Sequence, residues 1–331
     1  MVEADRFEWL LTYGFHDLLL CADFAERTVV EGDWRRRERV PDELAFQVGD
    51  LLSWCEDQYQ RTGSTEFGVD VGVEKCRFRI TAFPEASTGR LYFVRRGLIE
   101  WRNFGELGFS PALTHHLLER SCRGGVYIIG DTGEGKTSTG VSLVGTRLTL
   151  HGGLGLSIEK PVETNLNGVH GDGRCVVLEA ATKAGEYGEQ ISRALRAGTG
   201  IFHLAEIRCQ ETAYEAISTS LMGKFVVATS HGASPGQGLE RIARYAALNA
   251  RSSIESTASA LADGLTAVIW QRLIVHPGRE GKPIIYSRTL HLNKENEAGV
   301  RALIRRLEFD RIDIEVNRQR DEAIHAESLD S

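Results

Sequence analysis

Hydrophobic positions in the first hundred residues follow two periodicities, one typical of helices and one typical of strands. Apolar residues recur at helical spacing over 5–13, and Gly14 is placed to cap that helix. A second helix is expected to begin at Pro41, with an apolar side formed by Leu44, Val48, Leu51, Leu52, Cys55 and Tyr59. Five runs are predicted strands: HDLLLCA, RTVVEG, EFGVDVG, KCRFRITAF and GRLYFVRR. The last three are separated by charged or glycine-bearing turns, which predicts a small antiparallel sheet in a compact α+β domain.

The pattern changes after residue 105. Ser110 followed by Pro111 is typical of a helix start, with a capping residue and then proline at the first helical position. Further on, apolar runs that resemble buried strands alternate with helical or loop segments; these runs are GVYII, LSIEKP, IFHLAEI and KFVVATSH. The alternation predicts a mainly parallel sheet with helices on both faces and ligand chemistry at the carboxyl ends of its strands.

The length of the chain, 331 residues, exceeds the usual size of a single core, so two domains are expected. We predict an N-terminal domain over 1–103, a linker over 104–112, a second domain over 113–310 and a C-terminal tail over 311–331. The tail is polar from Arg318 onward and is expected to fray.

Composition excludes several classes of protein. Apolar content of 42% with 26% charged residues is ordinary for a globular protein, and a net charge of −7 argues against indiscriminate nucleic-acid binding. The six cysteines are scattered without a C-x-x-C pair, so neither a zinc site nor a disulfide framework is expected. No apolar run is long enough to span a bilayer and the chain starts with the acidic MVEADRFEWL, which predicts a cytoplasmic protein.

The strongest chemical signal is the stretch YIIGDTGEGKTST, which follows a predicted buried strand. Its glycines allow backbone N–H groups to converge on a phosphate, Lys136 supplies a positive charge and the Thr137 hydroxyl suits Mg²⁺. A helix starting near Lys136 would add its positive dipole end. The alternative is a glycine turn with an incidental lysine. The predicted nucleotide-binding residues are Gly130, Asp131, Thr132, Gly133, Glu134, Gly135, Lys136, Thr137 and Ser138.

This loop carries two acidic residues, Asp131 and Glu134, although it is predicted to bind an anion. Their side chains can point outward while the backbone amides point inward. The two carboxylates therefore weaken the nucleotide prediction only slightly.

Polar residues end three of the predicted strands: Glu159, Glu206 and His231. A carboxylate beside a phosphate loop can hold Mg²⁺ or orient the attacking water, and either glutamate could do so. His231 could hydrogen-bond a γ-phosphate. Taken singly, each glutamate could be a solvated cap and the histidine structural. Three polar strand ends beside one phosphate loop favour a catalytic site.

Five ordered motifs between Phe104 and Gln271 resemble the PilT/GspE superfamily of secretion and pilus motor ATPases. FGELGFSPAL resembles the lead-in to the phosphate loop, LSIEKPVE the Asp box and ALRAGTGIFHLAEIRCQETA the Walker B segment. GKFVVATSHGAS resembles the His box, and LADGLTAVIWQRL the stretch after it. In the first domain, GFHDLLLCA, VEGDWRRR and CRFRITAF also match the family. The resemblance implies a PAS-like α+β domain followed by a RecA-like domain.

The resemblance also implies roles for individual residues. Lys136 and Thr137 would bind ATP and Mg²⁺, with Glu206 as the Walker B carboxylate near the metal. Glu159 would be the candidate general base and His231 the sensor. The remaining implied catalytic residues are arginines of the first domain that reach a neighbouring subunit's nucleotide in a hexamer: Arg79, with Arg95 or Arg96.

Several positions depart from the family pattern. Lys160 replaces the aspartate of the Asp box, Cys209 the aspartate after Glu-Ile-Arg, and Ala205 a glycine. The usual Asp-Pro-Asp before the Walker B strand is Gly-Thr-Gly, over 198–200. These changes remove acidic groups near the metal and could slow hydrolysis. The short chain and these diverged boxes favour the PilT-like or the DotB/TraJ-like branch, which serves type IVB secretion and conjugation.

The favoured function is a cytoplasmic homohexameric ATPase that couples hydrolysis to a type IV secretion, conjugation or type IV pilus machine. Its expected partner is an inner-membrane platform protein, through which it would associate peripherally with the membrane. A second hypothesis is an ATP-binding ring that hardly hydrolyses ATP and acts as an assembly scaffold. A third, a DNA-pumping motor, is disfavoured because the chain is acidic and has no basic stripe with interleaved aromatics.

Overall fold

The structure is a computed structural model that describes residues 6–28, 34–72, 76–86, 89–96, 101–160, 162–180, 185–250, 252–274 and 284–329. It divides the chain into two compact units. Unit 1 comprises Met1–Ile99 and Lys160–Asn165, and unit 2 comprises Glu100–Glu159 and Leu166–Ser331. The segment Lys160–Asn165 therefore joins the first unit, although the sequence places it in the middle of the second predicted domain.

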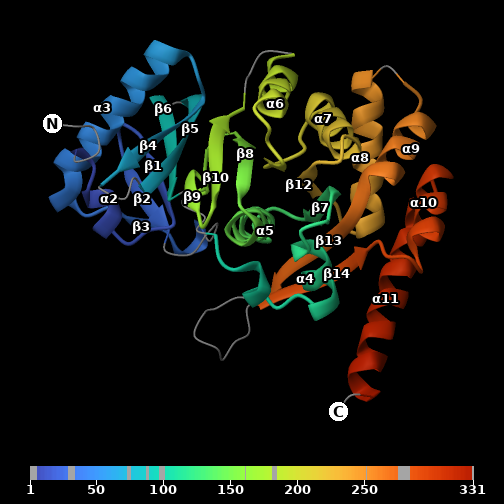
Figure 1. The fold of residues 1–331 in the computed structure, drawn as a ribbon. Helices are drawn as coiled ribbons and strands as arrows, with labels where there is room; N and C mark the ends of the chain where they lie inside the picture. Colours follow the sequence, from blue (N-terminus) through green and yellow to red (C-terminus); the bar gives the residue numbers. More distant parts are fainter. Residues whose placement is uncertain are drawn as a thin grey trace. The chain divides into compact units, whose positions relative to one another are not determined.

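Unit 1 is a six-stranded antiparallel sheet in the order β3-β2-β1-β6-β5-β4 (Figure 1). Its strands are β1 (Asp17–Leu20), β2 (Ala25–Thr28), β3 (Glu38–Arg39), β4 (Glu66–Val71), β5 (Cys76–Ala86) and β6 (Gly89–Arg96). Its helices are α2 (Trp9–Thr12) and α3 (Ala45–Thr62), with short 3-10 helices η1 (Trp34–Arg36) and η2 (Asp42–Leu44). The antiparallel sheet and the long helix confirm the predicted α+β organisation.

Alternation along the strands explains the core of unit 1. Phe78 and Ile80 of β5 share one side of the pleat and are fully buried, in the same cluster as Leu51 and Cys55 of α3. Of the helix predicted over 5–13, the described part includes α2 (Trp9–Thr12). The strand predicted over 27–32 is a strand as far as Thr28, and its remaining residues lie outside the described part.

Unit 2 is built on an eight-stranded sheet in the order β14-β13-β7-β12-β11-β8-β10-β9. The strands are β7 (Gly124–Gly130), β8 (Gly153–Glu159), β9 (Gly168–His170), β10 (Gly173–Glu179), β11 (Ile201–Leu204), β12 (Phe225–His231), β13 (Leu265–Ile274) and β14 (Ile284–His291). The six strands from β13 to β10 are parallel, and the edge strands β14 and β9 are antiparallel to their neighbours. The prediction of a mainly parallel sheet is confirmed. The antiparallel edge strands β14 and β9 were not predicted.

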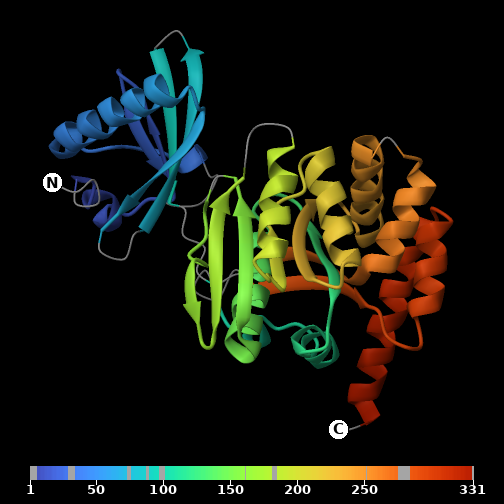
Figure 2. The ribbon, with the colours of Figure 1, turned by 45° about the horizontal axis from the view of Figure 1, so that its top comes forward.

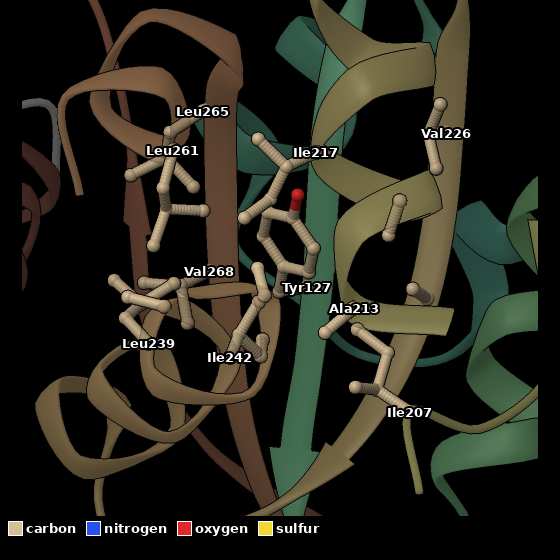
Figure 3. Close-up of a cluster of buried hydrophobic side chains, with 14 of the residues drawn as sticks. Tyr127, Ile207, Ala213, Ile217, Val226, Leu239, Ile242, Leu261, Leu265 and Val268 are labelled. Carbon is tan, nitrogen blue, oxygen red and sulfur yellow. The ribbon is translucent and has the colours of Figure 1, made fainter. Parts of the chain in front are cut away.

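Helices cover both faces of this sheet (Figure 2). They are α4 (Pro111–Leu118), α5 (Lys136–His151), α6 (Glu186–Arg196), α7 (Gln210–Leu221), α8 (Pro235–Ala250), α9 (Ile254–Gly264), α10 (Glu297–Arg305) and α11 (Phe309–Leu329). Tyr127 of β7 packs with Ile217 of α7 and Leu239 of α8 in the larger core (Figure 3). The opposite face contacts α5, where Gly140 lies close to His203 and Val227.

The predicted linker is part of unit 2. A 3-10 helix, η3 (Phe104–Glu106), occupies its start, and the buried Phe104 ring stacks on Phe109 at 5.1 Å. The predicted cap at Ser110 is present, since its hydroxyl accepts a hydrogen bond from the Leu113 N–H. Two aromatic rings buried against this unit explain why the segment is not a free connector.

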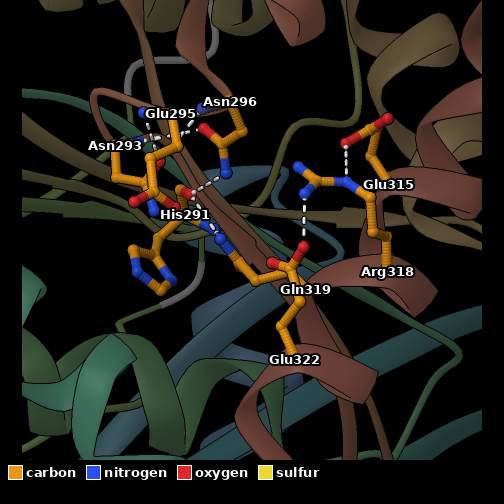
Figure 4. A network of polar contacts seen from close by, with 8 residues as sticks. All are labelled: His291, Asn293, Glu295, Asn296, Glu315, Arg318, Gln319 and Glu322. Atoms are coloured by element: carbon orange, nitrogen blue, oxygen red, sulfur yellow. Dashed lines mark hydrogen bonds and ion pairs between the residues drawn. The ribbon is translucent and has the colours of Figure 1, made fainter. Parts of the chain in front are cut away.

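The segment predicted as a C-terminal tail is helical as far as Leu329, since it belongs to α11, and residues 330–331 lie outside the described part. Ile312 and Val316 are buried in the core of unit 2. The Gln319 side-chain amide donates to the His291 carbonyl and accepts from the His291 N–H, both at 3.0 Å (Figure 4). These contacts with β14 hold the helix in place. The polar sequence gave no sign of them, because it showed only that one side of the helix is exposed. Within the described residues, none of the helices is long and apolar enough to cross a membrane.

Histidine burial makes the stability of unit 2 depend on pH. The rings of His116 and His291 lie 5.1 Å apart, and burial together with His116 lowers the pKa of His291 to about 4. Between pH 6.5 and 4 the His291 imidazole is protonated in the unfolded chain but largely neutral in the folded one. The free energy of unfolding therefore falls as pH falls. After allowance for partial exposure, we expect a loss of about 1–2 kcal/mol.

Urea unfolding across this pH range measures the pH dependence, and His291→Gln should reduce it by the His291 contribution, while the buried His203 and His116 continue to contribute. The matched control is His115→Gln, because the His115 side chain is 79% exposed. Equal pH dependence in wild type and His291→Gln would contradict this assignment.

Candidate nucleotide-binding site

The phosphate loop lies between the end of β7 and the start of α5. Gly133 and Gly135 have φ angles of 79° and 73°, which side chains rarely adopt. A Cβ atom on Gly130 would lie 2.5 Å from the carbonyl oxygen of Gln271 in the neighbouring β13. The local backbone therefore needs glycine at the three positions that the sequence singled out.

Lys136 is the first residue of α5 and is only 8% exposed. Its Nζ donates a hydrogen bond to the Asp131 carbonyl at 2.7 Å. Burial lowers the pKa of Lys136, and the nearby carboxylates of Glu206, Asp131 and Glu134 oppose that shift without cancelling it. The lysine therefore lies within electrostatic reach of the carboxylate that follows β11.

The acidic residues of the loop bind the protein's own amides. Glu134 accepts a hydrogen bond from the Leu273 N–H of β13, and its carbonyl accepts from the Gln271 side chain at 2.6 Å. Asp131 accepts from the Thr132 N–H at 2.7 Å. Glu134 and the fully buried Gln271 thus connect the loop to β13. The sequence analysis missed both roles, because β13 is more than 130 residues away from the loop.

Glu206 was predicted to end its strand. In the structure β11 ends at Leu204, and Glu206 lies two residues beyond it. One carboxylate oxygen accepts from His231 Nε2 at 2.9 Å, and the other pairs with Arg208 Nη2 at 2.5 Å. Burial raises the pKa of Glu206, but the hydrogen bond and charge of Arg208 and the adjacent His231 outweigh it, and the pKa is lowered. Sequence reasoning missed Arg208, although its spacing of two residues from Glu206 suits an extended segment.

Glu159 is the last residue of β8 and is almost fully buried. It accepts a hydrogen bond from the Ser157 hydroxyl at 2.7 Å, and that hydroxyl lies 2.7 Å from His203 Nδ1 on β11. Burial lowers the pKa of His203, so the ring is neutral and donates from Nδ1 to the serine oxygen. Ser157 and His203 were also missed, and the two-residue alternation from Ser157 to Glu159 was the available signal.

The three predicted arginines belong to unit 1, and the phosphate loop belongs to unit 2. Arg79 of β5 lies opposite Arg95 of β6 and pairs with Glu163 at 3.3 Å. Arg95 pairs at 2.6 Å with Asp17, whose carboxylate is fully buried. Arg96 lies on the last position of β6, and its side chain is outside the described part. Arg95 therefore has a structural partner, while Arg79 is held by acidic residues nearer the surface.

Residues 54–307 match the family described as "Type II/IV secretion system protein". The chain belongs to this family. This membership confirms the resemblance to secretion and pilus motor ATPases that the motifs indicated.

Two kinds of similarity accompany the family match. Over 269 residues the chain is 28% identical to the type IV pilus retraction ATPase PilT of Pseudomonas aeruginosa, covering 79% of this chain and 74% of that protein. A crystal structure of the pilus retraction motor PilT with bound ADP superposes with a TM-score of 0.69 at 20% identity, covering 93% and 88% of the two chains. The ATPase DotB of Legionella pneumophila also gives 0.69 at 15% identity, covering 93% and 86%. These structures confirm the predicted fold class of this family member.

Proposed function

We propose that this protein is an ATPase of a type IV pilus or type IV secretion machine, and that it works as a homohexameric ring. The carrying observation is the loop between β7 and α5, in which Lys136 lies within electrostatic reach of Glu206. A positive charge at a helix start, with loop amides beside it, suits the β- and γ-phosphates of ATP. Lys136 would exchange the Asp131 carbonyl for a phosphate oxygen.

The residues present fit a magnesium ion. Mg²⁺ is usually bound by one or two protein oxygen ligands together with substrate phosphates, and the Thr137 hydroxyl and the Glu206 carboxylate are donors of that type. When bound, the ion would neutralise phosphate charge. The lowered pKa of Glu206 keeps it ionised, which suits a ligand better than a proton acceptor.

Glu159 is then the better candidate for the general base. Its carboxylate ends β8 and accepts a hydrogen bond from the neutral Ser157 hydroxyl. Ser157 and His203 fix its orientation from the adjacent strand. His231 contacts Glu206 and could report the state of the γ-phosphate through that hydrogen bond. Arg79 would act on the nucleotide of a neighbouring subunit.

The Glu159→Gln variant tests this assignment. Loss of a general base is expected to lower kcat for phosphate release by about 10²–10⁴-fold while ATP binding persists. The control is Glu179→Gln, because Glu179 lies directly opposite Glu159 on β10 and is exposed. Equal rates in all three proteins would contradict Glu159 as the base.

The departures at Lys160, Ala205 and Cys209 keep a second function open, an ATP-binding scaffold with little hydrolysis. Lys160 is exposed at the end of β8, and Cys209 precedes α7, where it contacts Thr212 at 3.3 Å. Negligible phosphate release by the purified wild-type ring, unchanged in Glu206→Gln, would favour the scaffold.

For either function, we propose an inner-membrane platform protein as partner and a location at the cytoplasmic side of that membrane. Co-purification with candidate platform proteins would test this proposal.

A further inference from the structure

A cavity of about 280 Å³ lies at the edge of unit 2 opposite the phosphate loop. It adjoins the amino ends of three parallel strands, since Gly153 begins β8, Ile201 begins β11 and Phe225 begins β12. The proposed nucleotide site uses the carboxyl ends of the same strands. We call this cavity the basal pocket.

Positive charge dominates the basal pocket. Four cationic side chains line it, with His151 beside them: Arg120, Arg123, Arg147 and Lys224. No carboxylate is among the lining residues, and across the described ranges none of the four cations has an ion-pair partner within 4.0 Å. The nearby Glu119 carboxylate is 3.7 Å from His115. The local charge is therefore not neutralised by the protein.

Arg147 makes this a built site and not only a basic surface. It is 2% exposed, its guanidinium stacks on the Phe225 ring at 3.9 Å, and burial lowers its pKa to about 10. Its terminal nitrogens donate to the carbonyls of Leu117, Glu119 and Cys122. Its buried Nε has no hydrogen-bond partner within the described part of the protein. A buried cation without a counter-charge is costly, and a bound anion would offset that cost.

Some of these cations serve as hydrogen-bond donors to backbone carbonyls of the neighbouring loop, but this role does not account for all four. Arg147 and Arg123 both donate to carbonyls between Leu117 and Cys122. Arg120 and Lys224 make no side-chain hydrogen bond within the described ranges, so this explanation does not account for them. Their charges remain available to a ligand.

We propose that the basal pocket binds a small phosphate-bearing anion, at a site separate from the nucleotide site. Guanidinium groups match phosphate oxygens in pairs, and the lysine adds a point charge. The volume is at the low end for small-molecule pockets, which suits an inorganic or small organic phosphate. This inference does not depend on ATP hydrolysis and goes beyond the proposed function.

The test uses pyrophosphate as the probe and isothermal titration calorimetry at constant ionic strength. All proteins carry Lys136→Ala, which weakens phosphate binding at the nucleotide site. Because the Arg120 and Lys224 side chains make no hydrogen bond or ion pair within the described ranges, the added pair Arg120→Gln and Lys224→Gln should leave folding intact. We expect this pair to weaken pyrophosphate binding at least about tenfold.

The control pair is Arg241→Gln and Lys294→Gln, which removes the same charge from exposed positions elsewhere in unit 2. Pyrophosphate affinity should match that of Lys136→Ala alone. Absence of binding in the Lys136→Ala background, or equal weakening by both pairs, would overturn the proposal. Binding of a polyglutamate peptide without binding of pyrophosphate would also overturn it, and would indicate a protein-docking site.

Discussion

Replacing Lys136 with alanine is expected to lower steady-state phosphate release by at least about 10²-fold, the usual effect of removing one preorganised donor to a developing anion. The lysine is buried at the start of α5, where its Nζ donates a hydrogen bond to the Asp131 carbonyl of the loop. ATP affinity should fall as well, because the positive charge would contact the phosphates in the ground state and more strongly in the transition state. A coupled phosphate-release assay and titration with a fluorescent ATP analogue measure the two effects.

Lys294→Ala is the matched control for this experiment, since Lys294 is exposed in the segment before α10. Its turnover should equal that of wild type. If Lys136→Ala hydrolyses ATP at the wild-type rate, the loop between β7 and α5 is not the nucleotide site, and the proposed function fails with it.

Arg79→Ala is expected to lower kcat by about 10³–10⁵-fold, the range observed for arginines that act on transferring phosphates. ATP binding should persist, because the arginine would come from a neighbouring subunit and act mainly in the transition state. In the isolated unit the side chain is held near Glu66 and Glu163, at 3.8 and 3.3 Å. Both carboxylates are about a quarter exposed, so water can solvate them when the guanidinium is removed, and the variant should remain folded.

Arg95→Ala separates a catalytic arginine from a structural one. Removing the guanidinium beside the buried Asp17 carboxylate should lower the free energy of unfolding by about 1–3 kcal/mol in urea titrations. A mixture of Arg79→Ala and Lys136→Ala subunits gives a further test. Interfaces that combine an intact lysine with an intact neighbouring arginine should recover activity. Normal hydrolysis by Arg79→Ala alone, or no recovery in the mixture, would contradict the intersubunit assignment.

The sequence by itself determined the parts of this protein that depend on neighbouring residues. The phosphate loop needs glycines at fixed spacing between a strand and a helix, and the structure has positive φ angles at Gly133 and Gly135. Strand runs were recognised because alternation and β-branched residues are local signals, and they placed Glu159 and His231 on strand ends correctly. The family motifs extended this reasoning to most of the chain.

Only the tertiary structure decided which elements are neighbours. Periodicity tells which side of a strand is buried, but it does not tell which strand lies beside it. The hydrogen bond between Glu206 and His231, and the one between Ser157 and His203, depend on strand order and register in the sheet. The same limit explains why the packing of α11 against β14 was missed. The polar residues on the exposed face of a helix do not identify the strand against which its buried face packs.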